Sequence, residues 1–191
     1  MPLSALDPVP ALILVDLQKG VLRSERPEML AVIRNAAALA AAFRTRGLPV
    51  VLVNVAGGAP GRTDARATRP HTRRLRPENW TEIVPELGTD PEDILITKRR
   101  WGAFHDTALD GALRSRGVTQ VLIGGVATSI GVESTARSAH EHGYHVVLPI
   151  DVMFDGNPDS HTHSITHIFP RLGETTTADH ALRELSRRDA A

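Results

Sequence analysis

The chain has 191 residues, with 22 Lys and Arg against 22 Asp and Glu, nine His and no cysteine. This length and a composition of 41% hydrophobic and 23% charged residues indicate one globular domain, over residues 1–191. The missing cysteines exclude disulfides, cysteine-ligated metals and a thiol nucleophile. The balanced charge favours a small-molecule substrate as partner, with no nucleic acid and no membrane.

The N-terminal region contains no signal for export or membrane insertion. It has no basic segment, and its longest apolar run, residues 10–15, is far too short to span a bilayer. We therefore expect a cytoplasmic location.

Apolar runs alternate with longer Ala- and Leu-rich or amphipathic stretches, which predicts alternating strands and helices. Strands are predicted at residues 11–15, 50–55, 93–97, 120–123, 145–150 and 174–177. Helices are predicted at residues 27–46, 107–116, 129–141, 161–169 and 178–188. The expected fold class is α/β: a single-domain, three-layer α/β/α arrangement with a mostly parallel, Rossmann-like central sheet.

A long segment, residues 56–91, interrupts this alternation. It is rich in Gly and Pro and shows no sustained period, apart from a possible short helix at residues 80–87. Loops of this length inside a compact domain are usually lids or binding segments. Its Arg62, Arg66 and Arg69 either bind anions or are ordinary exposed loop charges.

Charged residues and glycines meet at the carboxyl edge of the predicted sheet, where such folds bind ligands. Asp16 follows the first strand, Lys98 the third, and residues 125–131 the fourth. A poorly solvated Asp16 would have a raised pKa suited to proton transfer, and Lys98 could lower that pKa or hold a substrate carboxylate. Alternatively, both are strand-end charges in water, or an ion pair without a catalytic role.

The glycine-rich residues 124–131 join the fourth strand to a helix. Glycines there permit unusual backbone angles or close approach of a ligand. With Thr128 as N-cap, free N–H groups of the first helical turn would bind a carboxylate or oxyanion. The alternative is a tight turn that needs glycine only for packing. Ser129 or Ser134 could replace a nucleophile, but the sequence shows no base that would activate either.

Three segments in this order resemble the isochorismatase-like, or cysteine hydrolase, family, which includes nicotinamidases, N-carbamoyl amide hydrolases and isochorismatases. They are LVDLQ at residues 14–18, TKRRWGAF at 97–104 and GVATSIGV at 125–132, the last continuing into residues 135–137. The resemblance extends from about residue 11 to residue 180.

This resemblance implies a catalytic set of Asp, Lys and Cys, in which Asp16 and Lys98 match the first two members and Gly131 stands in place of the cysteine. Isochorismatases proper also have glycine there, in a pair like Ile130-Gly131, and hydrolyse a vinyl ether without a covalent intermediate. Asp16 would protonate the vinyl CH2 carbon, water would attack the resulting oxocarbenium-like centre, and the hemiketal would collapse to pyruvate.

Residues around this set are predicted to bind the substrate. They are Gln18, Arg100, Trp101, Phe104, Val126, Ala127 and Ile130. The resemblance also implies a non-proline cis peptide between Val126 and Ala127 that directs backbone N–H groups into the site. Trp101 and Phe104 could equally pack in the core or at a subunit interface.

We expect no metal and no cofactor. His161, His163 and His167 are close in sequence, but no H-E-x-x-H pattern accompanies them, and helix histidines are usually solvated. The sequence thus predicts a hydrolase of a small carboxylated substrate, with a vinyl ether as first choice, assembled as a homodimer or larger homo-oligomer. Alternatives are a relative without catalytic activity that binds a small ligand, and a hydrolase of another bond that uses water activated by Asp16.

Overall fold

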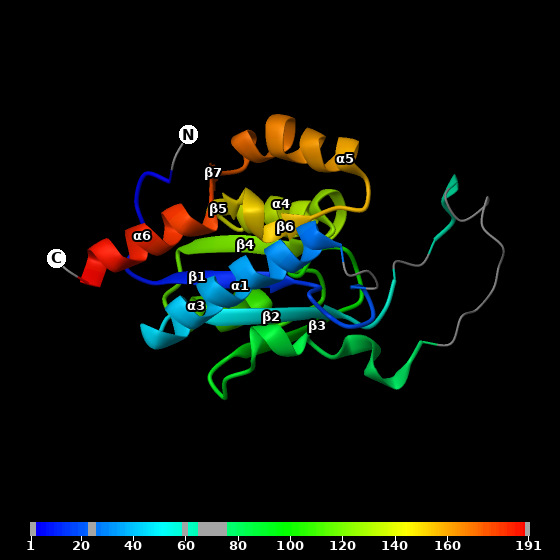
Figure 1. The fold of residues 1–191 in the computed structure, drawn as a ribbon, viewed down its shortest axis with the longest axis horizontal. Helices are drawn as coiled ribbons and strands as arrows, with labels where there is room; N and C mark the ends of the chain where they lie inside the picture. Colours follow the sequence, from blue (N-terminus) through cyan, green and yellow to red (C-terminus); the bar gives the residue numbers. More distant parts are fainter. Residues whose placement is uncertain (1–2, 23–25, 59–60, 65–75, 190–191) are drawn as a thin grey trace.

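The computed structural model describes residues 3–22, 26–58, 61–64 and 76–189. These residues form a seven-stranded sheet in the order β3-β2-β1-β4-β5-β7, with β6 beside β4 and every neighbouring pair parallel (Figure 1). The strands are β1 (Pro10–Val15), β2 (Val50–Val55), β3 (Ile94–Lys98), β4 (Gln120–Val126), β5 (His145–Pro149), β6 (Met153–Phe154) and β7 (Glu174–Thr176). The predicted α/β class with a parallel central sheet is confirmed.

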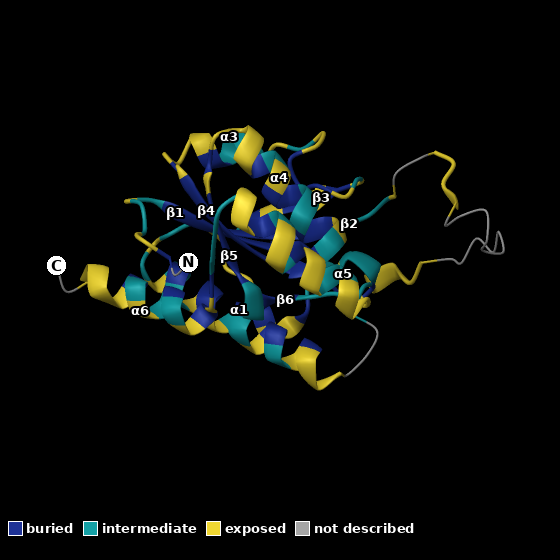
Figure 2. Ribbon diagram, turned by 90° about the horizontal axis from the view of Figure 1, so that it is seen from above, coloured by how far each residue is buried: buried dark blue, intermediate teal, exposed yellow. Residues whose placement is uncertain are grey.

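Helices cover both faces of the sheet, which gives the three predicted layers (Figure 2). The helices are α1 (Pro27–Thr45), α3 (Leu109–Arg114), α4 (Glu133–Glu141), α5 (Pro158–His163) and α6 (Ala178–Asp189). Helices α1 and α6 bury their apolar residues against one face, and α3 and α4 do so against the other. Along β1, Leu12 and Leu14 face the first layer while Ile13 faces the second, so every β1 side chain is buried.

Strand β4 is longer than predicted because Gly124 and Gly125 belong to it. Both are paired with β1 in register, and Gly125 has a φ of +124°. An ideal Cβ on Gly125 would lie 2.0 Å from the carbonyl oxygen of Val15. Only glycine therefore lets β1 and β4 approach at their carboxyl ends. The short β6 was not predicted, since two residues give no periodic signal.

Two predicted helices differ in form. The helix predicted at residues 129–141 starts with a wide π-helical turn, Thr128–Val132, before α4. The one predicted at 161–169 begins earlier, at α5, and continues through a second π-helical turn, Ser164–Ile168. A cap explains the earlier start of α5, because the Asn157 side chain accepts hydrogen bonds from the backbone N–H groups of its first turn.

The prediction of a short helix at residues 80–87 is wrong. Two separate 3₁₀ turns, Glu78–Thr81 and Pro85–Leu87, flank an extended stretch in which Ile83 forms an antiparallel bridge with Gln18. The stretch is extended because it docks on the chain after β1: the Lys19 N–H donates to the Glu82 carbonyl at 2.9 Å. This docking forms one wall at the carboxyl edge of the sheet.

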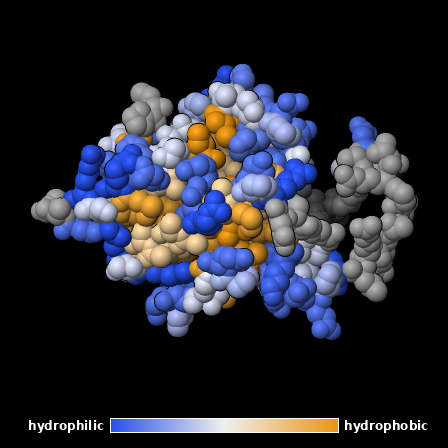
Figure 3. Space-filling model, viewed as in Figure 1, coloured by the Kyte–Doolittle hydropathy of each residue, from blue (hydrophilic) through white to orange (hydrophobic). Residues whose placement is uncertain are grey.

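The surface of the described residues mixes polar and apolar side chains. Figure 3 shows apolar patches between polar ones on the side of the molecule that faces the reader in Figure 1. Within the described ranges, no helix has both the length and the apolar character required to cross a membrane.

Candidate active site

Asp16 and Lys98 form a buried ion pair at the carboxyl edge of the sheet. Lys98 is the last residue of β3, and its side chain passes the end of β2 to bring Nζ within 2.8 Å of Asp16 Oδ2. Lys98 Nζ also donates to the Trp101 carbonyl at 2.5 Å. The side chains of Lys98 and Asp16 are only 1% and 10% exposed, so they do not face water.

The backbone holds Asp16 in a specific conformation. Its N–H donates to the Val53 carbonyl at 2.8 Å, and its φ is +56°, in the left-handed region that few residues other than glycine adopt. Aspartate and asparagine tolerate this region better than most residues do. The turn after β1 therefore directs the carboxyl group back over the sheet edge, toward Lys98.

The charge state of Asp16 reflects two opposing effects. Burial raises its pKa to about 6, although the charge and hydrogen bond of Lys98 act to lower it. Its Oδ1 atom is buried and has no hydrogen-bond partner among the described residues. Because buried polar atoms are nearly always paired, this oxygen is the atom through which Asp16 can exchange a proton with a ligand.

Gly131 lies beside the Asp16 carboxyl group. It belongs to the π-helical turn, and an ideal Cβ there would lie 3.2 Å from Asp16 Oδ2 and 3.1 Å from the Val126 carbonyl oxygen. Any side chain at this position would therefore crowd the carboxyl group. The peptide between Val126 and Ala127 is cis, as the resemblance implies. The structure thus brings Asp16, Lys98 and Gly131 together.

The turn that contains Gly131 is held by hydrogen bonds that differ from those predicted. Thr128 is not an N-cap: its hydroxyl hydrogen-bonds to His161 Nδ1 at 2.8 Å. The backbone N–H of Ser129 donates to Asp155 Oδ2, and those of Ile130 and Val132 donate to the Ala127 carbonyl. The prediction that the first-turn N–H groups are free is therefore wrong for these three residues, because Asp155 accepts one of the hydrogen bonds and the Ala127 carbonyl accepts the other two.

Two residues predicted to bind substrate have structural contacts. The Gln18 side chain is fully buried and hydrogen-bonds to backbone atoms of Val55 and Trp80, so it holds the docked stretch against β2. Phe104 is 8% exposed and packs in the core under α3 and α4, with its ring 5.1 Å from that of His142. Both side chains therefore have structural contacts within the chain, and core packing is one of the alternatives given for Phe104; their binding roles stay predictions.

The remaining predicted binding residues differ in exposure: Val126 is buried, Ala127 and Arg100 are half-buried, and Trp101 and Ile130 are exposed. Trp101 and Ile130 are 59% and 41% exposed, and each is close in sequence to a member of the set, Lys98 or Gly131. Arg100 is half-buried and donates to the Arg99 carbonyl at 3.2 Å. Arg62 is exposed, whereas Arg66 and Arg69 lie outside the described residues.

Asp155 and His161 contact this turn; Asp155 was not predicted to belong to the site, and His161 was considered only as a possible metal ligand. Burial acts to raise the pKa of Asp155, but hydrogen bonds from Asn157 and Ser129 outweigh it and lower that pKa below its usual value. Burial lowers the pKa of His161, against the charge of Asp155. The signal that could have found Asp155 is its place directly before a Gly-Asn-Pro turn at a strand end.

The histidines of the α5 region are not arranged as a metal site. His163 and His167 are exposed, and their rings stack with centroids 5.0 Å apart. Within the part of the chain that the structure describes, no group of three or more His, Asp or Glu side chains is placed to hold a metal ion.

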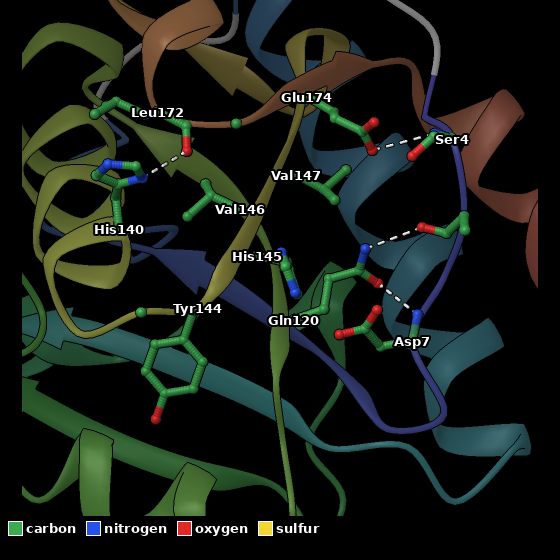
Figure 4. Close-up of a pocket in the computed structure, with 13 residues that line it drawn as sticks. Ser4, Asp7, Gln120, His140, Tyr144, His145, Val146, Val147, Leu172 and Glu174 are labelled. Atoms are coloured by element: carbon green, nitrogen blue, oxygen red, sulfur yellow. Dashed lines mark hydrogen bonds between the residues drawn. The ribbon is translucent and has the colours of Figure 1, made fainter.

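A cavity of about 540 Å³ lies at the opposite, amino edge of the sheet (Figure 4). Gln120 and His145, the first residues of β4 and β5, line it together with Asp7 and Glu174. In Figure 4 the Gln120 side chain bridges to the N-terminal segment, where it hydrogen-bonds to the backbone of Ala5 and Asp7. This cavity is therefore separate from the Asp16 site.

Comparison with known proteins agrees with the fold and the site. The isochorismatase domain model matches residues 10–180. The chain is 38% identical over 179 residues to the uncharacterized isochorismatase family protein YecD of Escherichia coli O157:H7, covering 92% of this chain and 95% of that protein. It is 32% identical over 147 residues to the ureidoacrylate amidohydrolase RutB of Methylobacterium radiotolerans, covering 68% of this chain and 57% of that enzyme.

Among solved structures, an isochorismatase family protein from Burkholderia thailandensis is similar, with a TM-score of 0.86 and 39% identity over 95% of this chain and 98% of that one. The fold and the site together define the class of protein: an α/β domain with a buried aspartate and lysine at the carboxyl edge of its sheet. The chain belongs to the isochorismatase family of hydrolases.

Proposed function

We propose that this hydrolase cleaves a vinyl ether in a small carboxylated substrate, with Asp16 as proton donor and no covalent enzyme intermediate. The observation that supports this most directly is the Asp16 carboxyl group, which has a pKa of about 6, an unpaired buried oxygen and Gly131 beside it. Vinyl ether hydrolysis requires an acid, and the chain has no cysteine to serve as a nucleophile.

In the proposed reaction, protonated Asp16 gives its proton to the terminal CH2 carbon of the vinyl ether. The double-bond electrons form the new C–H bond and leave an oxocarbenium-like centre next to the ether oxygen. Water adds to that centre and returns a proton to the Asp16 carboxylate. The resulting hemiketal then breaks its bond to the leaving alcohol and yields pyruvate.

Lys98 has two functions in this proposal. Its ammonium group orients the Asp16 carboxyl group, and of its three N–H bonds two are directed at Asp16 and the Trp101 carbonyl. The third can donate to a substrate carboxylate. Gly131 contributes by lacking a side chain, because an ideal Cβ there would lie 3.2 Å from Asp16 Oδ2 and would crowd the reacting carboxyl group.

A second candidate is amide hydrolysis by water that the Asp16 carboxylate activates as a general base. The observation that favours it is the similarity to ureidoacrylate amidohydrolases. With a pKa of about 6, Asp16 is mostly ionised at neutral pH and could accept a proton from water. The two candidates thus require opposite protonation states of the same carboxyl group.

The pH dependence of kcat/KM distinguishes these candidates. If Asp16 is the acid, kcat/KM falls about tenfold per pH unit above pH 6. If Asp16 is the base, kcat/KM rises up to about pH 6 and then stays level. The assays are pyruvate release from an isochorismate-type vinyl ether and ammonia release from ureidoacrylate. Absence of pyruvate from the wild-type protein would disprove the vinyl ether proposal.

A ligand-binding relative without catalysis would behave differently in both assays. It would be stabilised against heat by a metabolite that is recovered chemically unchanged after long incubation. Product analysis of each stabilising metabolite therefore accompanies the rate measurements.

A further inference from the structure

A second cavity, of about 490 Å³, lies between the start of α1, β6 and α5. This volume is within the roughly 300–1,000 Å³ of typical small-molecule sites. Its apolar lining includes Val32 from α1 and Phe154 from β6, both packed on the core between α1 and the sheet. The cavity therefore offers an apolar floor at the same carboxyl edge as the Asp16 site.

Groups of both charges surround this floor. Arg26 and Glu28, at the start of α1, line the cavity, are exposed, and form no ion pair or side-chain hydrogen bond with any other described residue. Asp155 also lines it, and its lowered pKa keeps it ionised at neutral pH. An unpaired cation and an unpaired anion beside an apolar floor match a ligand that has both charges and an apolar body.

His161, the fourth polar residue of the lining, presents a hydrogen-bond donor. Thr128 is fully buried, and His161 Nδ1, at 2.8 Å, is the one partner of its hydroxyl among the described residues. Because the Thr128 hydroxyl has no other acceptor for its hydrogen among the described residues, we assign it as the donor to Nδ1. The proton of the neutral imidazole is then on Nε2, which can donate to a carboxylate.

We propose that this cavity binds a small zwitterion with an apolar side chain, that is, an α-amino acid. Its carboxylate pairs with Arg26 and with Nε2–H of His161, and its ammonium group pairs with Glu28 and Asp155. Its side chain packs on the apolar floor. No feature of the proposed hydrolysis requires this cavity, so the site is additional to the Asp16 site.

The same two residues connect this cavity to the turn that contains Gly131. Asp155 Oδ2 accepts hydrogen bonds from the Ser129 N–H at 2.8 Å and its hydroxyl at 2.7 Å, while His161 Nδ1 is hydrogen-bonded to the Thr128 hydroxyl. A ligand that binds Asp155 and His161 therefore changes their hydrogen bonds to Ser129 and Thr128 and shifts the turn beside Asp16. This regulatory consequence rests on the proposed function, whereas the binding site itself does not.

Titration calorimetry with L-phenylalanine tests the site, with phenethylamine and 3-phenylpropionate as controls that each lack one charge. We expect L-phenylalanine to bind at least tenfold more tightly than either control. Arg26→Gln and Glu28→Gln should each weaken its binding about tenfold, and Glu141→Gln, at an exposed position on α4, should not. No binding of L-phenylalanine, or equal binding of all three compounds, would overturn the proposal.

Backbone amide chemical shifts of Ser129 and Gly131 test the connection without any activity assay. We expect both to move on saturation with L-phenylalanine, and the movement to be lost in Asp155→Asn. If they stay fixed while calorimetry shows binding, the regulatory connection is wrong and the site remains. Should the protein hydrolyse no vinyl ether, calorimetry and amide shifts still decide both points.

Discussion

Asp16 and Asp155 follow strands on either side of β4 at the same sheet edge, yet they titrate in opposite directions. Asp16 receives one hydrogen bond, from Lys98, and its other oxygen has no described partner, so burial raises its pKa to about 6. Asp155 accepts hydrogen bonds from Ser129 and Asn157, and its pKa is lowered. The deeper burial of Asp16 and the larger number of hydrogen bonds to Asp155 together separate the pKa values of the two carboxyl groups.

The largest expected effect comes from removing the proton of Asp16. Asp16→Asn should lower kcat/KM roughly 10²- to 10⁴-fold, the usual contribution of a positioned acid. Asp106→Asn is the matched control, because Asp106 also has a positive φ, of 52°, but is exposed. A comparable loss in both variants would show that the reaction does not depend specifically on the Asp16 carboxyl group.

The second effect comes from removing Lys98, the one hydrogen-bond donor to the Asp16 carboxyl group among the described residues. The chain has two lysines, one buried and one exposed, which makes Lys19→Met the control for Lys98→Met. Loss of the buried partner should lower the free energy of unfolding by about 3–5 kcal/mol, against about 0–1 kcal/mol for the surface pair. It should also raise the pKa of Asp16 above 6. Urea unfolding and NMR titration of the carboxyl carbon check both outcomes.

The sequence predicted the sheet and the Asp16 and Lys98 positions because both depend on local patterns. Apolar runs identify buried strands, and parallel strands place their carboxyl ends on one edge. The structural contacts of Gln18 and Phe104 could not be predicted because their partners are distant in sequence. Gln18 bonds across 62 residues to Trp80, and Phe104 stacks on His142.

Asp155 was missed for a related reason. It follows a strand of two residues, and its role depends on the backbone N–H of Ser129, 26 residues earlier. A periodic pattern cannot reveal such a contact. Similarly, Thr128 has the residue type of an N-cap, but a π-helical turn and a nearby His161 give its hydroxyl another partner.

The third effect is a pH dependence of opposite sign for the two carboxyl groups. Asp155 has a folded-state pKa below its unfolded value, so its charge stabilises the fold above about pH 4 and this contribution is lost as the pH falls through the folded pKa. Asp155→Asn should cost about 1–3 kcal/mol at pH 7 and progressively less below pH 4. Asp16, with a raised pKa, contributes stability that is lost as the pH rises through about 6. Urea unfolding of Asp16→Asn, Asp155→Asn and the wild-type protein between pH 3 and pH 8 measures how each carboxyl group contributes to the free energy of unfolding. Contributions that change with pH in the same direction would contradict the opposite signs expected for the two groups.

The smallest expected effect comes from removing one hydrogen-bond donor to Asp155, which makes the surroundings of its carboxyl group slightly more like those of Asp16. Ser129→Ala deletes the hydroxyl hydrogen bond of 2.7 Å to Asp155 Oδ2 but keeps the backbone N–H bond. The expected loss is about 1–2 kcal/mol, with a pKa of Asp155 that rises yet stays far below that of Asp16. Ser134→Ala, which removes no side-chain hydrogen bond between described residues, is the control. If the pKa of Asp155 does not move, the backbone N–H groups alone set its charge, and donor number matters less than donor type.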